Sequence, residues 1–410
     1  MHYNETVQDI VILGSTGSIG TQALEIVSSH PGHFRVLALA ASGNNLDLLA
    51  RQAVAYEVPI VAVAHGSVGD LDTAIRAAEA AAGKPHASHQ LLTGSVGVEA
   101  AAGAVPEGIV LNGIAGISGL HATLRALDSG AQLALANKES LVIGGSLVRE
   151  AVRRPGQIVP VDSEHSAIWQ ALASGKHERG LCSRKVTGYS EVSRLVLTAS
   201  GGPFHGKARH ELTNVTPDDA LRHPTWDMGK LVTVNSATMF NKGLEVIEAS
   251  LLFDIEPKFI DVVVHPVSIV HSMVQFRDGA TLLQASPPDM RIPIALGLSA
   301  PARLRDVALA CDWSEPVSWR FEPVDDVFAP AIDLARYAIS ASDTHPAVLA
   351  SADEVAVRAF LEGRLPFLGI YDVVSQVVNE HHGKTKPDLS ALEKTLEWAK
   401  TRVAELIAER

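Results

Sequence analysis

The sequence VQDIVILGSTGSIG, residues 7–20, decides the fold of the first part of the chain. Val7–Leu13 is a short apolar run typical of a buried strand, and Ser18–Ser29 follows with apolar residues at helical spacing. Gly14, Gly17 and Gly20 stand where the strand should give way to the helix. Glycines permit a tight turn, and the helix N-terminus presents free N–H groups to a pyrophosphate. The stretch therefore predicts a dinucleotide-binding strand–turn–helix unit.

The spacing of these glycines is GxxGxxG, whereas the common dinucleotide fingerprint is GxGxxG. A plain strand–helix turn is the alternative interpretation. The position of the motif and the hydroxyl groups of Ser15, Thr16 and Ser18 favour the nucleotide. A second expected strand, Phe34–Ala40, leads into Ser42-Gly43-Asn44 without an acidic residue for a ribose 2′-hydroxyl. That absence favours NADPH over NADH.

Short apolar runs and amphipathic runs alternate over residues 1–160, which predicts βαβ units and a parallel sheet covered on both faces. Further on, a loop-rich section at residues 201–228 separates expected strands, and four amphipathic runs close the chain. The predicted fold is α/β in four parts. These are a Rossmann-like NADPH domain (1–160), a central α/β catalytic domain (161–300), a linker (301–330) and a C-terminal α-helical bundle (331–410).

Bulk composition excludes several classes of protein. The chain has 410 residues, 47% of them hydrophobic, which suits a folded protein of more than one domain. Its net charge of −12 disfavours nucleic-acid binding. Cys182 and Cys311 suggest neither a metal site nor a disulfide framework. Residues 108–124 look like a buried strand and loop rather than a membrane span, and Glu5 and Asp9 do not suit a secretory signal, so we expect a cytoplasmic protein.

Paired carboxylates suggest a metal site. Asp162 and Glu164 follow a short apolar run, and on an extended backbone residues i and i+2 point the same way. Two hard carboxylates on one side suit Mg²⁺ or Mn²⁺, although a solvated surface pair is the more common explanation of such a motif. Glu245 could complete the site, but Asn235–Glu245 also reads as an ordinary helix start.

Several polar groups could bind a phosphate or a substrate. Ser236, Asn241 and Lys242 lie close together in sequence, and the turn Ala199–Pro203 could grip a phosphate or simply end a strand. His223–Gly229 places Trp226 in a polar loop, where it could cover a small substrate, although a core position would be unremarkable.

A second ligand-facing position is expected in the first domain. Asn137-Lys138-Glu139 ends an expected strand, the edge at which open α/β sheets bind ligands. The alternative is a charged helix start, where Glu139 would be favoured by the helix dipole.

Together these motifs resemble the 1-deoxy-D-xylulose 5-phosphate reductoisomerase family, in the family's order and over nearly the whole chain. The matching runs are Gly14–Gly20, Ala136–Ser140, Asp162–Glu164, Ala199–Phe204, His223–Lys230, Asn235–Glu245, His265–His271, Pro288–Pro293, His345–Val348 and Asp353–Val357. The resemblance implies an NADPH- and divalent-metal-dependent homodimer. It would rearrange 1-deoxy-D-xylulose 5-phosphate and reduce it to 2-C-methyl-D-erythritol 4-phosphate, in isoprenoid precursor synthesis.

The resemblance also assigns residues. The catalytic set would be Lys138, Asp162, Glu164 and Glu245, the last three being the metal ligands. The substrate contacts would be Lys138, Ser163, Glu164, Ser200, His223, Trp226, Ser236, Asn241, Lys242, Glu245 and Met290. The cofactor contacts would be Gly14, Ser15, Thr16, Gly17, Ser18, Ile19, Ser42, Gly43, Asn44, Asn137, Glu139 and Gly229. The strand at Ile269–Phe276 would contribute to the dimer interface.

Three features depart from the family pattern. Ser42-Gly43-Asn44 lacks the Lys that some members carry beside the 2′-phosphate. The segment Gly175–Arg194 is longer and more basic than usual and is expected to loop out beside the catalytic domain. Leu349–Glu354 lacks an Asn expected near Ala350.

Two other functions compete with this interpretation. An aspartate-semialdehyde-type dehydrogenase would need a nucleophilic cysteine in the catalytic domain, and neither cysteine is well placed for that role. A non-catalytic NADPH sensor would need neither three carboxylates nor a phosphate-binding set.

Overall fold

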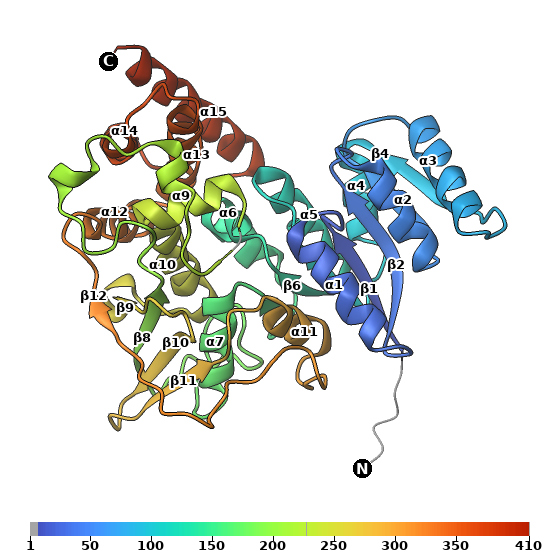
Figure 1. Ribbon diagram of the computed structural model, residues 1–410, viewed down its shortest axis with the longest axis horizontal. Coiled ribbons are helices and arrows are strands. Elements are labelled where there is room, and N and C mark those ends of the chain that lie inside the picture. Colours follow the sequence, from blue (N-terminus) through green and yellow to red (C-terminus); the bar gives the residue numbers. More distant parts are fainter. Residues whose placement is uncertain (1–6, 227, 410) are drawn as a thin grey trace. The chain divides into compact units, whose positions relative to one another are not determined.

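The chain folds into two compact units (Figure 1). The structure is a computed structural model that describes residues 7–226 and 228–409, so Asp227 of the motif His223–Lys230 lies outside the described residues. The first unit takes the described part of Met1–Ser140 together with Glu150–Ser166 and Asp289–Ala308. The second takes Leu141–Arg149, Ala167–Pro288 and the described part of Leu309–Arg410. The chain therefore passes between the units several times.

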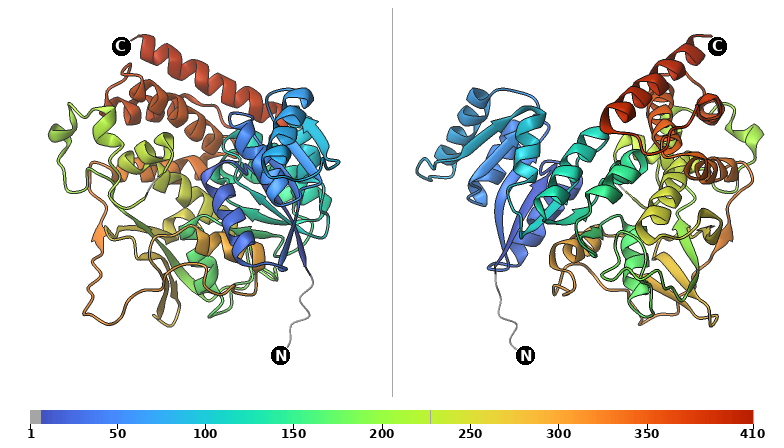
Figure 2. Two further views of the ribbon diagram at one scale, coloured as in Figure 1. Left: turned by 45° about the vertical axis from the view of Figure 1, so that its right-hand side comes forward. Right: turned by 180° about the vertical axis from the view of Figure 1, so that it is seen from behind.

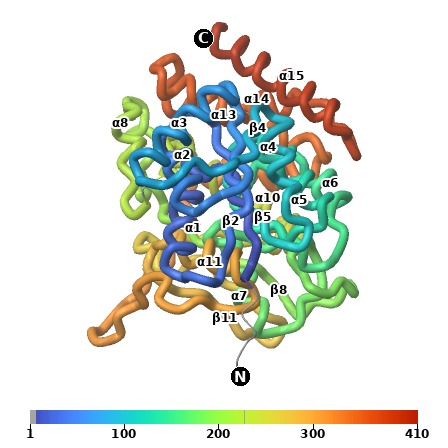
Figure 3. The backbone as a smooth tube through the Cα atoms, turned by 90° about the vertical axis from the view of Figure 1, so that its right-hand side faces the viewer, coloured from blue at the N-terminus to red at the C-terminus, as the bar shows by residue number. Residues whose placement is uncertain are grey.

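A seven-stranded parallel sheet of order β4-β3-β2-β1-β5-β6-β7 forms the centre of the first unit. Its strands are β1 (Gln8–Leu13), β2 (Phe34–Ala41), β3 (Ile60–Val63), β4 (Gln90–Thr93), β5 (Ile109–Asn112), β6 (Gln132–Leu135) and β7 (Ile158–Pro160). Its helices are α1 (Ser18–Ser29), α2 (Leu46–Ala55), α3 (Val68–Ala81), α4 (Gly94–Ala102), α5 (Ile117–Ser129) and the start of α6 (Lys138–Ala151). Figure 3 shows α1, α2 and α3 with strand β2. The predicted α/β fold with a parallel, doubly wound sheet is confirmed.

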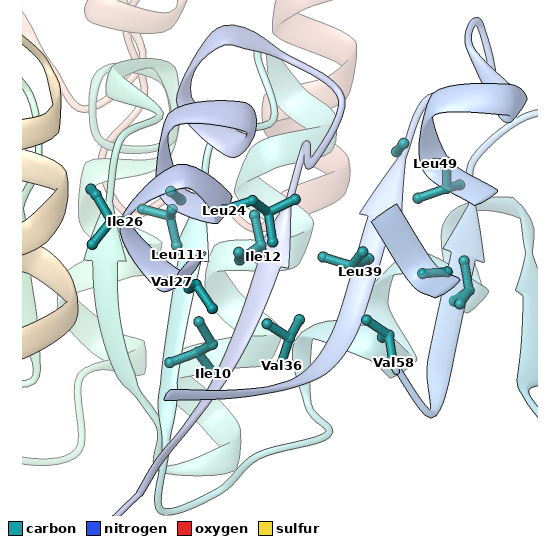
Figure 4. Close-up of a cluster of buried hydrophobic side chains, with 14 of the residues drawn as sticks. Ile10, Ile12, Leu24, Ile26, Val27, Val36, Leu39, Leu49, Val58 and Leu111 are labelled. Atoms are coloured by element: carbon teal, nitrogen blue, oxygen red, sulfur yellow. The ribbon is translucent and has the colours of Figure 1, made fainter. Parts of the chain in front are cut away.

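Aliphatic side chains from strands and helices form the core of this unit (Figure 4). Ile10 and Ile12 project from β1, and Leu24 and Ile26 come from α1. Each is at most 3% exposed. Burying one such side chain stabilises a fold by roughly 1.5–3 kcal/mol, so α1 is held against the sheet mainly by these contacts.

One helix of the first unit comes from much later in the chain. α11 (Arg291–Ser299) contacts α1, β5, β6 and β7, and Ile294, Ala295 and Leu298 are buried in the same core. The compact units therefore do not follow the expected boundaries at 160, 300 and 330. The division of the chain by function remains a prediction.

The second unit contains a five-stranded mixed sheet of order β11-β10-β8-β9-β12. Its strands are β8 (Val192–Ala199), β9 (Ile260–Val264), β10 (Val270–Phe276), β11 (Thr281–Ala285) and β12 (Glu322–Pro323). β8 and β9 run parallel, whereas β10 is antiparallel to both of its neighbours, β8 and β11. β10 is thus an interior strand, and β11 is an edge.

Helices make up much of the second unit, and its last four agree with the four amphipathic runs predicted at the end of the chain (Figure 2, orange to red). The helices of the second unit are the continuation of α6, α7 (Ser163–Leu172), α8 (Pro217–Ala220), α9 (Lys230–Thr238), α10 (Phe240–Phe253), α12 (Ala329–Ala341), α13 (His345–Leu361), α14 (Phe367–Glu380) and α15 (Leu389–Ala408). Two 3-10 turns lie at Arg209–Leu212 and Pro257–Phe259. α13 packs against both α14 and α15. The expected C-terminal helical bundle is present.

Two predictions about local backbone conformation are wrong. Asp162 and Glu164 do not share an extended strand, because α7 begins at Ser163 and the Asp162 carbonyl accepts the first helical bond, from the Ser166 N–H, at 2.8 Å. An acidic residue in a first helical turn is favoured by the helix dipole, which explains Glu164 there. In the stretch 108–124, the part expected to be a loop continues into helix α5 from Ile117.

The prediction that the segment 175–194 loops out is also wrong. The His177 Nε2–H donates to the Phe253 carbonyl at 2.7 Å, and a Cβ on Gly180 would meet the backbone of Leu252 at 2.2 Å. The side chain of Cys182 is buried. This segment therefore packs against the C-terminal end of α10, because His177 and Gly180 contact the backbone of the last residues of that helix.

No helix within residues 7–226 and 228–409 has both the length and the apolar character needed for a membrane crossing.

Candidate active site

The turn between β1 and α1 has the geometry of a phosphate-binding loop. Gly14 has φ +82°, and the N–H groups of Gly14 and Ser15 both donate to the Ala40 carbonyl of β2, at 2.8 and 3.0 Å. A Cβ on Gly20 would lie 2.4 Å from the Gly14 carbonyl oxygen and from Ser15 Cα. Only glycine at position 20 lets the helix approach the turn this closely.

The N-terminus of α1 lacks a side-chain cap. Gly17 occupies the capping position and makes no side-chain bond, so the first N–H groups of the helix are open to a ligand. Gly17 and Ser18 are exposed, Thr16 and Ile19 are half-buried, and Ser15 is buried. The buried Ser15 supports the turn, whereas the other four line its open side.

The loop after β2 is close-packed at its glycine. Gly43 has φ +103°, and a Cβ there would lie 2.2 Å from the His65 carbonyl oxygen. Ser42 and Asn44 are exposed, and the Asn44 N–H donates to Ser42 Oγ at 3.3 Å. The loop thus offers uncharged hydroxyl and amide groups to solvent, as the sequence predicts.

The end of β6 starts α6 through Asn137. Its side-chain oxygen accepts from the Ser140 N–H at 2.7 Å, and its amide donates to Glu139 at 2.7 Å. Sequence reasoning missed the support behind it. Thr123 Oγ1 donates to Ser140 Oγ at 3.1 Å and accepts from the Asn112 amide at 2.9 Å. These buried polar groups fix the direction in which α6 leaves the sheet.

Lys138 and Asp162 form an ion pair in the first unit, with Lys138 Nζ 2.9 Å from Asp162 Oδ2. Both side chains are about 15% exposed or less. Burial alone would raise the pKa of Asp162, but the charges of Lys138 and His165 outweigh it and hold that pKa well below its usual range. Asp162 is therefore an ionised carboxylate at neutral pH, which is the form a metal ion requires.

Sequence reasoning missed His165, which follows Glu164 directly. Its Nδ1 lies 3.9 Å from Asp162 Oδ2, and its side chain is fully buried. The i,i+3 spacing of Asp162 and His165 would have indicated this proximity had the segment been read as a helix. In the same turn Ser163 Oγ donates to Glu164 at 2.5 Å. Met290, in contrast, packs against the core of the first unit.

In the second unit, one imidazole connects two serine hydroxyls. His223 Nε2 lies 2.9 Å from Ser200 Oγ and 3.1 Å from Ser236 Oγ. His223 Nδ1 accepts the backbone N–H groups of Thr225 and Trp226, at 3.2 and 2.9 Å. Because Nδ1 accepts, the ring proton sits on Nε2 and points at the serines. Both serine hydroxyl hydrogens can then be donated to a third group.

Burial also lowers the pKa of His223, so the neutral ring is the favoured form. Ser200 belongs to a turn in which Gly201 and Gly202 have φ +84° and +66°. The Gly202 N–H donates to Ser200 Oγ at 3.2 Å, which leaves that oxygen's proton for another acceptor. The predicted phosphate-gripping turn therefore has two converging hydroxyl donors and a neutral imidazole behind them.

Trp226 lies on the same loop, half-buried, with its ring centroid 6.1 Å from that of His271. Gly229 is the capping residue of α9 and is exposed. It belongs to the second unit, whereas the other predicted cofactor residues belong to the first.

A buried charged group starts α10. Lys242 Nζ forms an ion pair with Glu245, and the Asn241 amide donates to the same carboxylate. Lys242 is 4% and Glu245 1% exposed. Isolated buried charges are costly, so these two groups require each other or a ligand of opposite charge.

Sequence reasoning also missed a buried carboxyl next to Ser236. The Asn235 amide donates to Asp353 Oδ2 at 2.6 Å, tying α9 to α13. Burial raises the pKa of Asp353 to about 8, although the bond from Asn235 opposes that shift. Both residues were in motifs quoted for the family resemblance, but nothing in the sequence marked them as partners.

These features define a class of protein: an α/β enzyme with a dinucleotide-type glycine turn and a separate, largely side-chain-built set of groups for an anionic substrate. Three family models match the chain. They are 1-deoxy-D-xylulose 5-phosphate reductoisomerase over residues 10–145, that enzyme's C-terminal domain over 158–253, and the DXP reductoisomerase C-terminal domain over 285–402.

Relatives and solved structures agree with these matches. The chain is 54% identical over 408 residues to a 1-deoxy-D-xylulose 5-phosphate reductoisomerase of Beutenbergia cavernae, covering 98% of each chain. It is 54% identical over 371 residues to that of Bifidobacterium longum subsp. infantis, covering 90% of this chain and 89% of the relative. The Zymomonas mobilis enzyme in complex with NADPH is 35% identical, with a TM-score of 0.86 over 98% of this chain and 99% of that one.

A further solved structure is a DOX-P reductoisomerase in complex with NADPH, fosmidomycin and magnesium. It is 32% identical, with a TM-score of 0.84 over 98% of each chain. The chain belongs to the 1-deoxy-D-xylulose 5-phosphate reductoisomerase family.

Proposed function

We propose that this protein converts 1-deoxy-D-xylulose 5-phosphate to 2-C-methyl-D-erythritol 4-phosphate with NADPH and one divalent metal ion, a step of isoprenoid precursor synthesis. The observation that carries the proposal is the 54% identity to a reductoisomerase along 98% of both chains. The substrate is a phosphorylated sugar, whose skeleton rearranges to a branched aldehyde before reduction.

The donor set fits both cofactors. Asp162, Glu164 and Glu245 are carboxylates that could hold a metal ion, and hard oxygen ligands suit Mg²⁺ or Mn²⁺. The ionised state of Asp162 supports this role. The tight turn at Gly14–Gly20 and the uncapped N-terminus of α1 support NADPH on the first unit, because only glycine fits at position 20 and the first helical N–H groups have no side-chain cap. When bound, the metal supplies Lewis-acid stabilisation of negative oxygens, and NADPH supplies the hydride.

The chain's own groups then bind and orient the substrate. We propose that Ser200 and Ser236 donate their hydroxyl hydrogens to the phosphate, because His223 occupies the opposite side of both oxygens. Asn241 and Lys242 add an amide and an ammonium group. Lys138 and Ser163 contact the carbon skeleton, and Lys138 keeps Asp162 ionised.

In this proposal Trp226 and Met290 provide apolar surface against the substrate, and Trp226 covers the substrate and excludes water. The cofactor contacts are those at Gly14–Ile19, Ser42–Asn44, Asn137, Glu139 and Gly229.

The competing functions are less well supported. Burial and the charge of Glu248 raise the pKa of the Cys182 thiol well above its usual value, so it is a poor nucleophile. A thioester-forming dehydrogenase is therefore disfavoured. A sensor without catalysis would bind NADPH but consume none.

Assembly and compartment are further proposals. We propose a cytoplasmic homodimer formed through the second unit's sheet. β10 is an interior strand, so the edge strand β11, where Leu282 and Leu283 are 37% and 41% exposed, is the better candidate for contact. Sedimentation equilibrium should give twice the chain mass, and a monomer at micromolar concentration would contradict the proposal.

The function is tested by following NADPH absorbance with purified protein, 1-deoxy-D-xylulose 5-phosphate and Mg²⁺ or Mn²⁺. We expect oxidation that stops with EDTA, returns on adding metal, and is lost in Asp162→Asn. Asp72→Asn, which breaks only a surface pair with Arg76, is the matched control and should keep full activity. NADPH binding without oxidation under either metal would reject the proposed reaction and favour the sensor.

A further inference from the structure

The C-terminal helices border an open cavity of about 450 Å³ that the proposed reaction does not use. Its lining residues come from the end of α14, the loop that follows, and α15, all within the second unit. Small-molecule sites usually measure 300–1,000 Å³, so this cavity has the size of one.

The cavity carries uncompensated positive charge. Arg402 is already paired with Glu380, at 2.6 Å, so these two lining groups neutralise one another. Lys384 and Lys394 also line the cavity, and the ammonium group of neither has a hydrogen-bond or ion-pair partner within residues 7–226 and 228–409. Two ammonium groups around one cavity favour an anion there.

An imidazole in the wall adds an oriented donor. Thr344 Oγ1 accepts the Lys384 N–H at 2.9 Å and lies 2.9 Å from His381 Nε2, which fixes the orientation of the ring. Burial first, and then the positive charges of His345, His382 and Lys384, lower the pKa of His381 to about 4. The ring is therefore neutral at pH 7 and acts as an N–H donor.

A flat apolar wall completes the cavity. Trp398 projects from α15 and is 37% exposed, although indole is usually largely buried. Its ring lies 5.2 Å from that of His381, at an interplanar angle of 36°, and His345 packs edge-on against His381 at 4.8 Å. This stack holds the indole in place and leaves part of it open for a planar ligand.

We propose that this cavity binds a nucleoside diphosphate, with its base on Trp398 and its phosphates at Lys384 and Lys394. Aromatic side chains stack on bases of any sequence, and lysines bind phosphates as point charges. The His381 N–H can bond the ribose or a phosphate oxygen. The proposal is independent of the reductoisomerase function, because it uses none of the groups assigned to that reaction.

The test is calorimetric titration of the full-length protein with ADP while NADP⁺ saturates the dinucleotide site. We expect one additional ADP per chain. Lys394→Ala and Lys384→Ala should each weaken binding about tenfold, the usual effect of one charged hydrogen bond. Lys400→Ala is the matched control, because Lys400 is an exposed lysine of the same helix outside the cavity lining, and it should leave binding unchanged.

Trp398→Leu should weaken ADP binding without weakening inorganic pyrophosphate, which cannot stack. NADPH oxidation should stay normal in all four variants, which confirms that they are folded. The proposal is overturned if ADP does not bind once NADP⁺ is present. It is also overturned if pyrophosphate binds as tightly as ADP, or if Lys400→Ala and Lys394→Ala weaken binding equally.

Discussion

The groups proposed to bind ligands differ in kind between the two units. In the first, the turn at Gly14–Ser18 offers backbone N–H groups, and glycines allow the close packing of helix and turn that presents them. In the second, the groups proposed to bind substrate are side chains: Lys242 and Glu245 are nearly fully buried, and His223 lies between two serines. A backbone-built site tolerates changes of charge but not of volume. A side-chain-built site tolerates small changes of volume but not of charge.

The largest expected effect is in the buried charges of the second unit. Glu245→Gln keeps the volume but leaves the Lys242 ammonium group without its carboxylate. We expect a loss of about 3 kcal/mol in the free energy of unfolding, as for other broken buried pairs. Activity should fall roughly a thousandfold, because a charge that stabilises the reaction is lost. Urea unfolding and initial rates measure the two, and near-wild-type values of both would show that the pair is not needed.

The next effect tests volume in the first unit. Gly20→Ala places a Cβ 2.4 Å from backbone atoms of Gly14 and Ser15, which must shift. Overpacking of this kind costs about 2 kcal/mol, equivalent to roughly thirtyfold weaker NADPH binding.

Gly69→Ala is the control for this glycine. It also lies in a helix, but the nearest contact of its Cβ would be ordinary, at 3.7 Å. NADPH fluorescence titration should separate the two variants clearly. Equal affinities would mean that the turn can yield, contrary to the comparison above.

A smaller effect concerns the tautomer of His223. Asn at this position can still accept the N–H groups of the turn but loses the donor to Ser200 and Ser236. We expect KM for the phosphorylated substrate to rise about tenfold while kcat changes little, since one hydrogen bond to a charged ligand is weakened.

The pH dependence of His223 has a defined sign. The pKa of His223 in the folded protein lies below the ordinary value of 6.5. The contribution of the neutral ring to the stability of the site is therefore complete above pH 6.5 and is lost as the pH falls through the folded pKa. KM should rise below pH 6.5 in the wild type and less in His223→Asn. Identical pH profiles would exclude titration of His223 as the cause.

The last expected effect is a gain of stability. Asp353 has a carboxyl pKa of about 8, against 3.8 when unfolded, so the folded state loses stability as the pH rises from 3.8 to 8. Asp353→Asn keeps an acceptor for Asn235 and removes the titration. We expect it to be more stable than the wild type at pH 8, with the difference vanishing towards pH 4. Urea unfolding at both pH values measures this, and a destabilised variant at pH 8 would mean that the carboxylate is needed.

Much of the first unit could be predicted because its signals are local. The helix at Ser18–Ser29 has the predicted bounds, because apolar spacing and a glycine turn are signals that lie within a few residues of one another. β4 and β7 were missed because Gln90–Thr93 and Ile158–Pro160 are too short to show alternation. α11 belongs with this unit only through packing, which no local pattern reveals.

The site was less predictable than the fold where distant groups depend on one another. The family motifs located His223, Ser200 and Ser236, but only the structure shows one imidazole between two hydroxyls. The pair Asn235–Asp353 joins residues far apart in sequence, and burial rather than residue type shifts the carboxyl pKa. Asp162 and Glu164 were read as a strand because an i,i+2 pattern does not distinguish a strand from a helix start.

The late arrival of α11 has a consequence for biosynthesis. Ile294 and Leu298 complete a core whose strands leave the ribosome long before them, and the whole stretch 167–288 is translated in between. At usual elongation rates that interval is on the order of ten seconds. For that time the nascent chain displays an uncovered apolar sheet face, which is the kind of surface that chaperones bind. The order of elements along the chain, and not only the final packing, thus determines when the core of the first unit can be completed.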